Sequence, residues 1–518
     1  MAERNDLFEI LNANVIENPK KKYIFFKKDV YTYRQTIDIV ENAAMVMSQN
    51  GVKKGDRVGL LMGSTPEFIF AFYAIMRLGA IAIPINVFLK AREIGNNLAD
   101  CEADSIITSN QFAEVVPHLA EFDPHLAKIF SFDKETTFPS VNLYQRATVN
   151  SRDVVVSRDK DDVALLVYTS GTTGKPKGVM LTHANILANA RPIKGLIDIV
   201  PKDRFLSVLP MFHSFAFTVN VISPAYCGAS IVILESVMEM KTKEYKKMLL
   251  LKRPTIIAGV PQIYAAMAKM EINFFQRLVF PFRAIVSGGA SLPGETMRRF
   301  YQNFGKPVIE GYGLSEASPV ISFNPPYKQK AGSVGLPLTG VEVKVVNDEG
   351  ELCKPNEPGE LCARGANVMK GYWNQPAETA RTIVDGWLHT GDVAVLDEEG
   401  FITIVDRIKD LIIAKGINVY PSEIEELLHV YQGVGTVAVV GVPDSDGNET
   451  IVAYIIPDET GVIDEKGIKQ FAKKNLAAYK LPKYYITVKE LPMTGTGKVL
   501  KKELRVQAKA DLAKMKGE

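Results

Sequence analysis

The chain has 518 residues, a formal net charge of +2 and a hydrophobic content of 47%. That length exceeds what one hydrophobic core usually organises, so two or more domains are expected. The near-neutral charge argues against general nucleic-acid binding, and the 23% of charged residues is ordinary for a globular protein. The four cysteines have no C-x-x-C spacing, which argues against a disulfide framework or a zinc site. Cysteines without such a framework fit a protein of the reducing cytoplasm.

The two ends of the chain differ in character. The N-terminal stretch MAERNDLFEIL has no apolar signal core. The most apolar stretch, Phe68 to Phe88, is interrupted by Arg77, Gly79 and Pro84, so no transmembrane span is expected. Residues 466–518 hold fourteen Lys and Arg against four acidic residues, which leaves peripheral contact with an anionic membrane open.

Short apolar runs alternate with helical patterns up to about residue 330, which predicts an α/β architecture with mainly parallel sheets. Residues 331–405 contain strands separated by Asp-Glu-Gly turns and predict a β-rich subdomain. A new unit of mixed helices and strands, a small α+β domain, follows 406–410. The predicted organisation is an N-terminal domain over 1–405, a hinge at 406–410 and a mobile C-terminal domain over 411–518. The strand-like runs are RVGLLM (57–62), AIAIPI (80–85), SIIT (105–108), SIVIL (230–234) and AIVSGG (284–289).

Residues 168–178, YTSGTTGKPKG, combine hydroxyls, glycines and two lysines with no acid. The apolar run 163–167 predicts a buried strand before this loop, 178–181 predicts a second strand, and Thr182 is a suitable N-cap for a following helix. Glycines allow successive backbone N–H groups to surround an anion, so the loop predicts a polyphosphate site. The spacing does not match the Walker A pattern.

EGYGLSEASP (310–319) brings an aromatic ring, a hydroxyl and a carboxylate together. Tyr312 could stack on a base, and Glu316 could hold the Mg²⁺ that accompanies ATP. The segment around Ser315 also comes close to the G-x-S-x-G nucleophile elbow, so a serine hydrolase that uses Ser315 is an alternative. In WLHTGDVAV, Asp392 is suited to accept hydrogen bonds from ribose hydroxyls.

Five ordered motifs resemble those of the adenylate-forming superfamily, which includes acyl-CoA synthetases, peptide-synthetase adenylation domains and beetle luciferases. They are YTSGTTGKPKG, PMFHSFAF, EGYGLSE, HTGD with DRIKD, and GTGK near the end, and they span nearly the whole chain. The fatty-acid:CoA ligase branch is the most similar. The resemblance implies that a medium- or long-chain fatty acid reacts with ATP to acyl-AMP and pyrophosphate, after which the acyl group passes to the CoA thiol and AMP leaves.

The resemblance also implies residue roles. Thr169 and Glu316 would hold Mg²⁺, Lys498 would bridge the carboxylate and α-phosphate, and Lys409 would be the residue about which the C-terminal domain rotates. After that rotation Lys415 and Gly416 would line the CoA tunnel. His213, Phe217 and Gly313 would line the acyl pocket, His213 also acting in catalysis. Nucleotide binding would involve Thr169, Ser170, Gly171, Thr172, Thr173, Gly174, Lys175, Lys177, Gly289, Ala290, Glu310, Gly311, Tyr312, Gly313, Ser315, Asp392, Arg407 and Lys498.

The implied cofactors and substrates are ATP, Mg²⁺, CoA and a fatty acid. A second hypothesis is the same adenylation with the phosphopantetheine of an acyl carrier protein as acceptor. A third is the serine hydrolase, and a fourth is a non-catalytic acyl-adenylate binding module. The sequence leaves a homodimer open and does not fix the acyl chain length.

Overall fold

The computed structural model describes residues 5–169, 176–235, 242–270, 272, 277, 282–414, 417–443, 449–458, 461, 463–493 and 499–516. The chain folds into two compact units. Unit 1 comprises Met1–Leu292, Thr296–Val343 and Ala363–Leu388, and unit 2 comprises Pro293–Glu295, Lys344–Cys362 and His389–Glu518. The boundary at 405/406 and the hinge at 406–410 stay predictions.

Unit 1 contains an eight-stranded sheet in the order β19-β9-β8-β4-β3-β5-β6-β7. From β8 through β4, β3, β5 and β6 to β7 the neighbouring strands are parallel, while β9 is antiparallel to β8. The central strands are short, and they are mostly apolar because both of their faces are buried. The bounds of the eight strands are β3 (Arg57–Leu61), β4 (Ile81–Pro84), β5 (Ser105–Thr108), β6 (Lys128–Ser131), β7 (Val141–Asn142), β8 (Val163–Thr169), β9 (Lys177–Thr182) and β19 (Gly371–Tyr372).

A nine-stranded sheet in the order β16-β15-β14-β13-β12-β10-β11-β1-β2 also lies in unit 1. The strands from β14 to β1 are parallel, whereas β15, β16 and β2 are antiparallel to their neighbours. The bounds are β1 (Lys22–Phe26), β2 (Asp29–Thr32), β10 (Arg204–Ser207), β11 (Ser230–Ile233), β12 (Ile256–Gly259), β13 (Ala284–Ser287), β14 (Ile309–Gly313), β15 (Val320–Phe323) and β16 (Leu336–Pro337).

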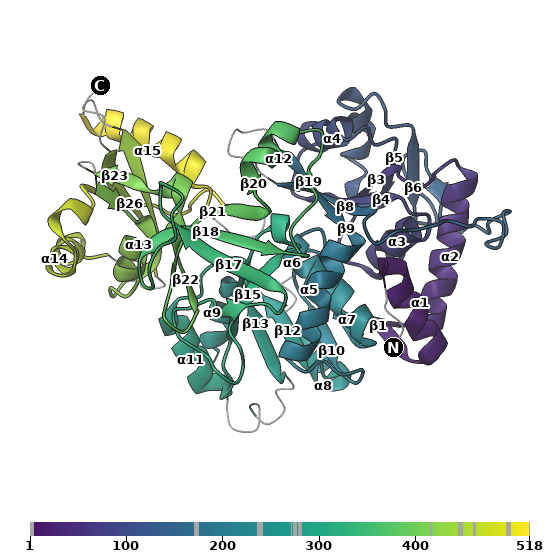
Figure 1. Cartoon of the computed structure of the whole chain (residues 1–518), viewed down its shortest axis with the longest axis horizontal. Coiled ribbons are helices and arrows are strands. Elements are labelled where there is room, and N and C mark those ends of the chain that lie inside the picture. Colours follow the sequence, from purple (N-terminus) through teal and green to yellow (C-terminus); the bar gives the residue numbers. More distant parts are fainter. Residues whose placement is uncertain are drawn as a thin grey trace. The chain divides into compact units, whose positions relative to one another are not determined.

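Several helices of unit 1 have buried apolar side chains. Figure 1 shows α1 and α2 beside each other near the N-terminus, and α3 is buried along almost its whole length. The side chain of Thr182 caps α5 by accepting the N–H of Asn185 at 3.1 Å, as its N-cap position predicts. The bounds are α1 (Leu7–Glu17), α2 (Tyr33–Gln49), α3 (Pro66–Arg77), α4 (Ala91–Asp100), α5 (His183–Leu196), α6 (Ser214–Phe217), α7 (Ser223–Cys227), α8 (Lys243–Lys252), α9 (Pro261–Ala268), α11 (Gly294–Phe304) and α12 (Pro376–Thr382).

A five-stranded sheet has the order β17-β18-β21-β20, with β22 paired to β21. It corresponds to the β-rich region that the Asp-Glu-Gly turns predict. Its strands are β17 (Val341–Val346), β18 (Pro358–Gly365), β20 (Ile383–Val384), β21 (Trp387–Leu396) and β22 (Ile402–Arg407).

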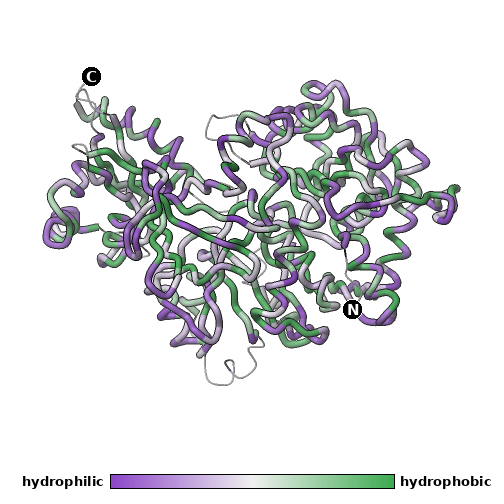
Figure 2. The backbone as a smooth tube through the Cα atoms, in the orientation of Figure 1, coloured by the Kyte–Doolittle hydropathy of each residue, from purple (hydrophilic) through white to green (hydrophobic). Residues whose placement is uncertain are grey.

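The C-terminal part of unit 2 is a small α+β structure. It contains the two-stranded sheet β23-β24 and the three-stranded sheet β25-β26-β27. α14 is mostly hydrophilic in Figure 2, whereas α15 buries Leu504, Ala508 and Leu512. The bounds are β23 (Ile412–Ala414), β24 (Ile417–Val419), β25 (Val434–Pro443), β26 (Glu449–Pro457), β27 (Tyr484–Thr487), α13 (Pro421–His429), α14 (Glu465–Asn475) and α15 (Lys501–Lys516).

The predicted fold class is confirmed, because parallel α/β sheets, a β-rich region and a small α+β C-terminal part are all present. Within the described ranges, no helix combines the length and the apolar character that a membrane crossing requires.

Candidate active site

The nine-stranded sheet gathers several predicted site residues where its parallel strands end. His213 follows β10, Gly289 follows β13, and Tyr312 lies at the end of β14. Ser287 pairs with Glu310 in parallel register, which sets the segment after β13 beside the end of β14. Ligands of open α/β sheets bind outside the carboxyl ends of the strands, so these segments define a candidate site.

Backbone geometry shapes this edge. Gly289 has φ +85°, a left-handed conformation that turns the chain after β13. At Gly313 a Cβ would lie 1.9 Å from the carbonyl oxygen of Pro319, so only glycine fits there. Glu310 is buried, and its Oε1 accepts the N–H of Leu292 at 2.9 Å. Glu310 therefore supports the loop after β13 in this structure.

Two serine hydroxyls join the segment after β10 to the segment after β14. Ser214 Oγ and Ser315 Oγ are 3.0 Å apart. His213 caps the short helix α6, with its Nδ1 3.3 Å from the N–H of Phe215. The contact between the two hydroxyls therefore places the backbone of His213 next to the segment of Ser315. This proximity is required if the motifs PMFHSFAF and EGYGLSE belong to one site. A π-helical turn, Thr218–Ile222, follows α6, and such turns are frequent at functional sites.

Glu316 is held from two sides. Its carbonyl oxygen accepts the N–H of Met369 at 2.8 Å, and its Oε1 accepts the hydroxyl of Tyr372 at 3.0 Å. Burial and the Glu316 carboxylate raise the pKa of Tyr372, so the phenol stays protonated and acts as the donor. Tyr372 therefore fixes one oxygen of Glu316, and the residues that the structure describes offer the other oxygen no hydrogen-bond partner.

The two arms of the predicted phosphate loop form an antiparallel hairpin. Thr169 ends β8 and pairs with Lys177 at the start of β9. The Lys177 ammonium is nearly buried, forms an ion pair with Glu378 and lies 5.1 Å from the centre of the Tyr372 ring. This lysine thus has an anionic partner within the protein itself. The predicted loop residues Ser170, Gly171, Thr172, Thr173, Gly174 and Lys175 lie outside the described residues.

Asp392 and Arg407 face each other across the β21–β22 pair. They are direct cross-strand partners, and Arg407 Nε lies 3.4 Å from Asp392 Oδ1. Asp392 is 8% exposed, whereas the Arg407 side chain is about half exposed. The two residues that the resemblance assigns to the ribose are therefore neighbours, and Arg407 offers donors that a ligand can reach.

Two sets of side-chain contacts flank Lys409. Before it, Asp406 Oδ2 accepts both the N–H and the Oγ–H of Ser422 at 2.9 Å, at the N-terminus of α13. After it, Asp410 Oδ1 pairs with Arg505 at 2.8 Å. Lys409 itself lies in a short 3₁₀ turn, Ile408–Asp410. The predicted residues Lys415, Gly416 and Lys498 lie outside the described residues.

Phe217 lies in the hydrophobic core of unit 1. It is 1% exposed, and its ring packs edge-on against Phe72 at 4.7 Å between centroids. An acyl-lining role would require the ring to leave this packing, so that role stays a prediction.

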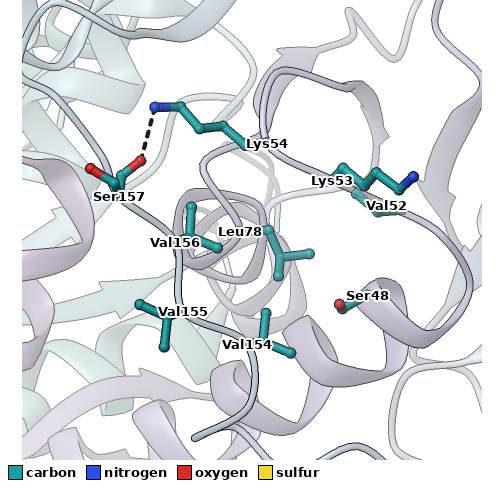
Figure 3. Close-up of a pocket in the computed structure, with 9 residues that line it drawn as sticks. All are labelled: Ser48, Val52, Lys53, Lys54, Leu78, Val154, Val155, Val156 and Ser157. Atoms are coloured by element: carbon teal, nitrogen blue, oxygen red, sulfur yellow. Dashed lines mark hydrogen bonds between the residues drawn. The ribbon is translucent and has the colours of Figure 1, made fainter.

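A cavity of about 360 Å³ lies elsewhere in unit 1 (Figure 3). Lys54 lines it and donates to the carbonyl oxygen of Ser157, which also lines it, at 2.8 Å. The wall is mainly apolar, and none of the predicted site residues belongs to it. The lining residues are Ser48, Val52, Lys53, Lys54, Leu78, Val154, Val155, Val156 and Ser157.

The α/β sheets, the strand-end residues and the Glu316 carboxylate agree with the expected class, an adenylate-forming enzyme. Residues 11–373 match the AMP-binding enzyme family, and residues 423–498 match the AMP-binding enzyme C-terminal domain. The chain belongs to the AMP-binding enzyme family. The predicted superfamily and enzyme class, an AMP-forming acyl-CoA synthetase, are confirmed.

Three similar proteins illustrate this membership. The chain is 34% identical to a long-chain-fatty-acid–CoA ligase of Bacillus subtilis, over 96% of this chain and 94% of that protein. It is 35% identical to a feruloyl-CoA synthase of Amycolatopsis, over 92% and 93% of the two chains. The crystal structure of ATP-bound MatB from Rhodopseudomonas palustris matches with a TM-score of 0.89 at 28% identity, and the match covers 98% of this chain and 99% of that chain.

Sequence reasoning missed Tyr372, Glu378 and Ser214 as parts of this region. Ser214 lies inside the PMFHSFAF motif and could have been found there. Tyr372 and Glu378 belong to none of the five motifs. Only the fold brings Tyr372 to Glu316 and Glu378 to Lys177.

Proposed function

We propose that the chain is an ATP-dependent fatty-acid:CoA ligase acting on a medium- or long-chain acid. A carboxylate oxygen attacks the α-phosphate of ATP, and pyrophosphate leaves. The CoA thiol then attacks the acyl carbon, and AMP leaves. The observation that carries the proposal is the gathering of His213, Gly289, Tyr312 and Ser315 at the strand ends of one sheet.

The nucleotide roles follow from the chemistry of these side chains. Tyr312 would stack on adenine beside the backbone of Gly289 and Ala290. Ser315 would donate a hydrogen bond to the α-phosphate. Asp392 would accept from the ribose hydroxyls, with Arg407 donating beside it.

Magnesium fits the oxygen donors of Glu316 and Thr169. Glu316 has one oxygen bonded to Tyr372 and, among the described residues, no partner on the second, and carboxylate and hydroxyl oxygens suit this hard cation. When bound, the ion would offset the negative charge of the triphosphate. Thr169 lies at the end of β8, where the predicted phosphate loop begins.

The acid substrate is tested by fatty-acid-dependent pyrophosphate release. A panel from acetate to stearate, with ferulate included, separates a fatty-acid ligase from an aryl-acid ligase. The aryl alternative is supported by the 35% identity to a feruloyl-CoA synthase. If ferulate supports pyrophosphate release and none of the fatty acids does, an aryl acid would replace a fatty acid as the proposed substrate class.

The acyl acceptor is tested separately. Thioester formation on CoA supports the proposal, and formation only on a carrier-protein phosphopantetheine supports the alternative ligase. The hydrolase alternative is disfavoured, because the hydroxyl of Ser315 meets the hydroxyl of Ser214, which is not a general base.

The two half-reactions test the proposed domain rotation. Lys498→Ala should abolish acyl-AMP formation yet still convert supplied acyl-AMP and CoA to thioester. Lys409→Pro should do the reverse, because proline fixes φ at about −65° and would hinder rotation. Rapid quench with labelled fatty acid follows both steps. Equal loss of both half-reactions in both variants would refute the rotation and leave Lys409 a linker residue.

A further inference from the structure

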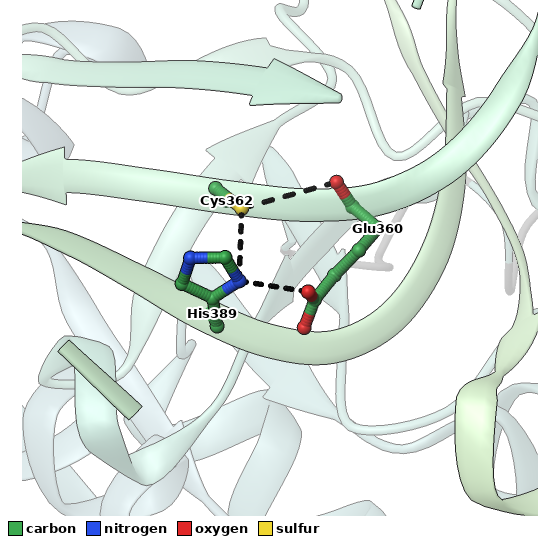
Figure 4. Close-up of side chains that lie close together, drawn as sticks. All are labelled: Glu360, Cys362 and His389. Atoms are coloured by element: carbon green, nitrogen blue, oxygen red, sulfur yellow. Dashed lines mark hydrogen bonds and ion pairs between the residues drawn. The ribbon is translucent and has the colours of Figure 1, made fainter. Parts of the chain in front are cut away.

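Two neighbouring strands of the five-stranded sheet carry three potential metal ligands. Glu360 and Cys362 are two residues apart on β18 and therefore point to the same face of the sheet. His389 lies on the adjacent strand β21. Figure 4 shows the three side chains converging, and their donor atoms all lie within 4.8 Å of one another.

One of the distances between these atoms matches a tetrahedral zinc site, and a second is shorter than such a site requires. Cys362 Sγ is 3.5 Å from His389 Nδ1. A tetrahedral ion with ordinary zinc–sulfur and zinc–nitrogen bonds separates such atoms by about 3.5 Å. His389 Nδ1 is 2.7 Å from Glu360 Oε2, a hydrogen-bond distance. This pair would have to open by roughly 0.6 Å to admit the ion, a side-chain adjustment.

The surroundings hold the ligands in place. Glu360 Oε1 accepts the N–H of Gly391 at 3.0 Å, which directs the other oxygen, Oε2, toward the cluster. Thr390 donates to the carbonyl oxygen of Leu361 at 2.7 Å and ties the two strands together beside the ligands. Contacts of this kind orient metal ligands and are part of a metal site.

Exposure differs among the ligands in a way that suits metal entry. Cys362 is fully buried, while the side chains of Glu360 and His389 are 22% and 29% exposed. An ion could reach the cluster from the side of the carboxylate and imidazole, with the sulfur beneath it. Three protein ligands would leave the fourth position to water.

We propose that Glu360, Cys362 and His389 form a site for one divalent ion of the zinc class. Thiolate and imidazole select zinc-like ions over Mg²⁺, which prefers oxygen. The site shares no residue with the proposed Mg²⁺ site at Thr169 and Glu316. On binding, the sulfur forms a bond to the ion and the thiol proton passes to solvent.

The test uses the purified full-length chain, stripped with a chelator, and Co²⁺ as a spectroscopic probe. A thiolate-to-cobalt charge-transfer band in the near ultraviolet, with intense tetrahedral bands in the visible, is expected and should disappear when Zn²⁺ is added. Cys362→Ser should lose the charge-transfer band and weaken Zn²⁺ binding by about tenfold or more. Cys353→Ser is the matched control, because Cys353 is outside the cluster and should leave the band unchanged.

Folding is checked by circular dichroism in the presence of chelator. Should Cys362→Ser fail to fold, His389→Gln serves in its place and should weaken Zn²⁺ binding and lose the tetrahedral visible bands. Zn²⁺ should also raise the Tm of the wild type and of Cys353→Ser, but not of the ligand variants. Absence of the cobalt band in the wild type, or its persistence in Cys362→Ser, would show that the cluster is only a hydrogen-bonded group.

Discussion

The hydrogen bond from Tyr372 to Glu316 makes a strong prediction about magnesium. Tyr372→Phe removes the donor at 3.0 Å but keeps the ring that lies against Lys177. A hydrogen bond to a charged group contributes about 1.5–3 kcal/mol. Because Glu316 is only half-buried, the lower figure applies, and it corresponds to a loss of about tenfold. Loss of a residue that orients a metal ligand typically has an effect of about this size.

The assay is the dependence of pyrophosphate release on Mg²⁺ at fixed ATP and fatty acid. Tyr372→Phe should shift the half-saturating Mg²⁺ concentration upward by about tenfold, with the melting temperature nearly unchanged. Tyr454→Phe is a matched control, because its hydroxyl also donates to a carboxylate, that of Asp511 at 2.8 Å, outside the proposed site. A wild-type Mg²⁺ dependence in Tyr372→Phe, or an equal shift in Tyr454→Phe, would refute the reasoning.

Three further variants test other parts of the structure. Glu316→Gln keeps the side-chain volume and removes the charge, so pyrophosphate release should fall by about a hundredfold or more while circular dichroism is unchanged; near-normal release would exclude a metal role. Ser315→Ala should lower release only about tenfold, because one hydrogen bond to a charged group is lost; covalent labelling of Ser315 by a fluorophosphonate probe would instead support a hydrolase. His183 is 2% exposed, and burial lowers its pKa from 6.5 to about 4. The unfolded chain therefore binds a proton that the folded chain excludes, so the free energy of unfolding should decrease by up to about 3 kcal/mol as pH falls through this interval. Urea unfolding of His183→Gln should lack this component, and an unchanged pH slope would contradict the assignment.

Local patterns were sufficient to predict several of the elements that carry the site, but not β10, which precedes His213. The apolar runs at 163–167 and 178–181 became β8 and β9, and Thr182 caps the following helix because its hydroxyl meets a free N–H group. These features depend on neighbours in the sequence, where spacing and side-chain chemistry are visible.

Interactions between distant segments could not be predicted in this way. Tyr372 meets Glu316 across 56 positions, and Lys177 meets Glu378 across 201. Cysteine spacing along the chain reveals only zinc sites whose ligands are close in sequence. The Glu360, Cys362 and His389 cluster needs two strands placed side by side, which only the sheet order provides.

The capping of α13 by Asp406 bears on the energetics of a pivot at Lys409. Asp406 precedes the pivot and Ser422 follows it, so a rotation there must break both 2.9 Å hydrogen bonds to the carboxylate. If the predicted rotation occurs, at about 1.5 kcal/mol each the two bonds would bias the resting population toward one orientation by roughly a hundredfold. Hydrogen exchange at the Ser422 amide would then measure how often the enzyme departs from that orientation. The helix cap would thereby act as a latch, and substrate binding would have to supply the energy that releases it.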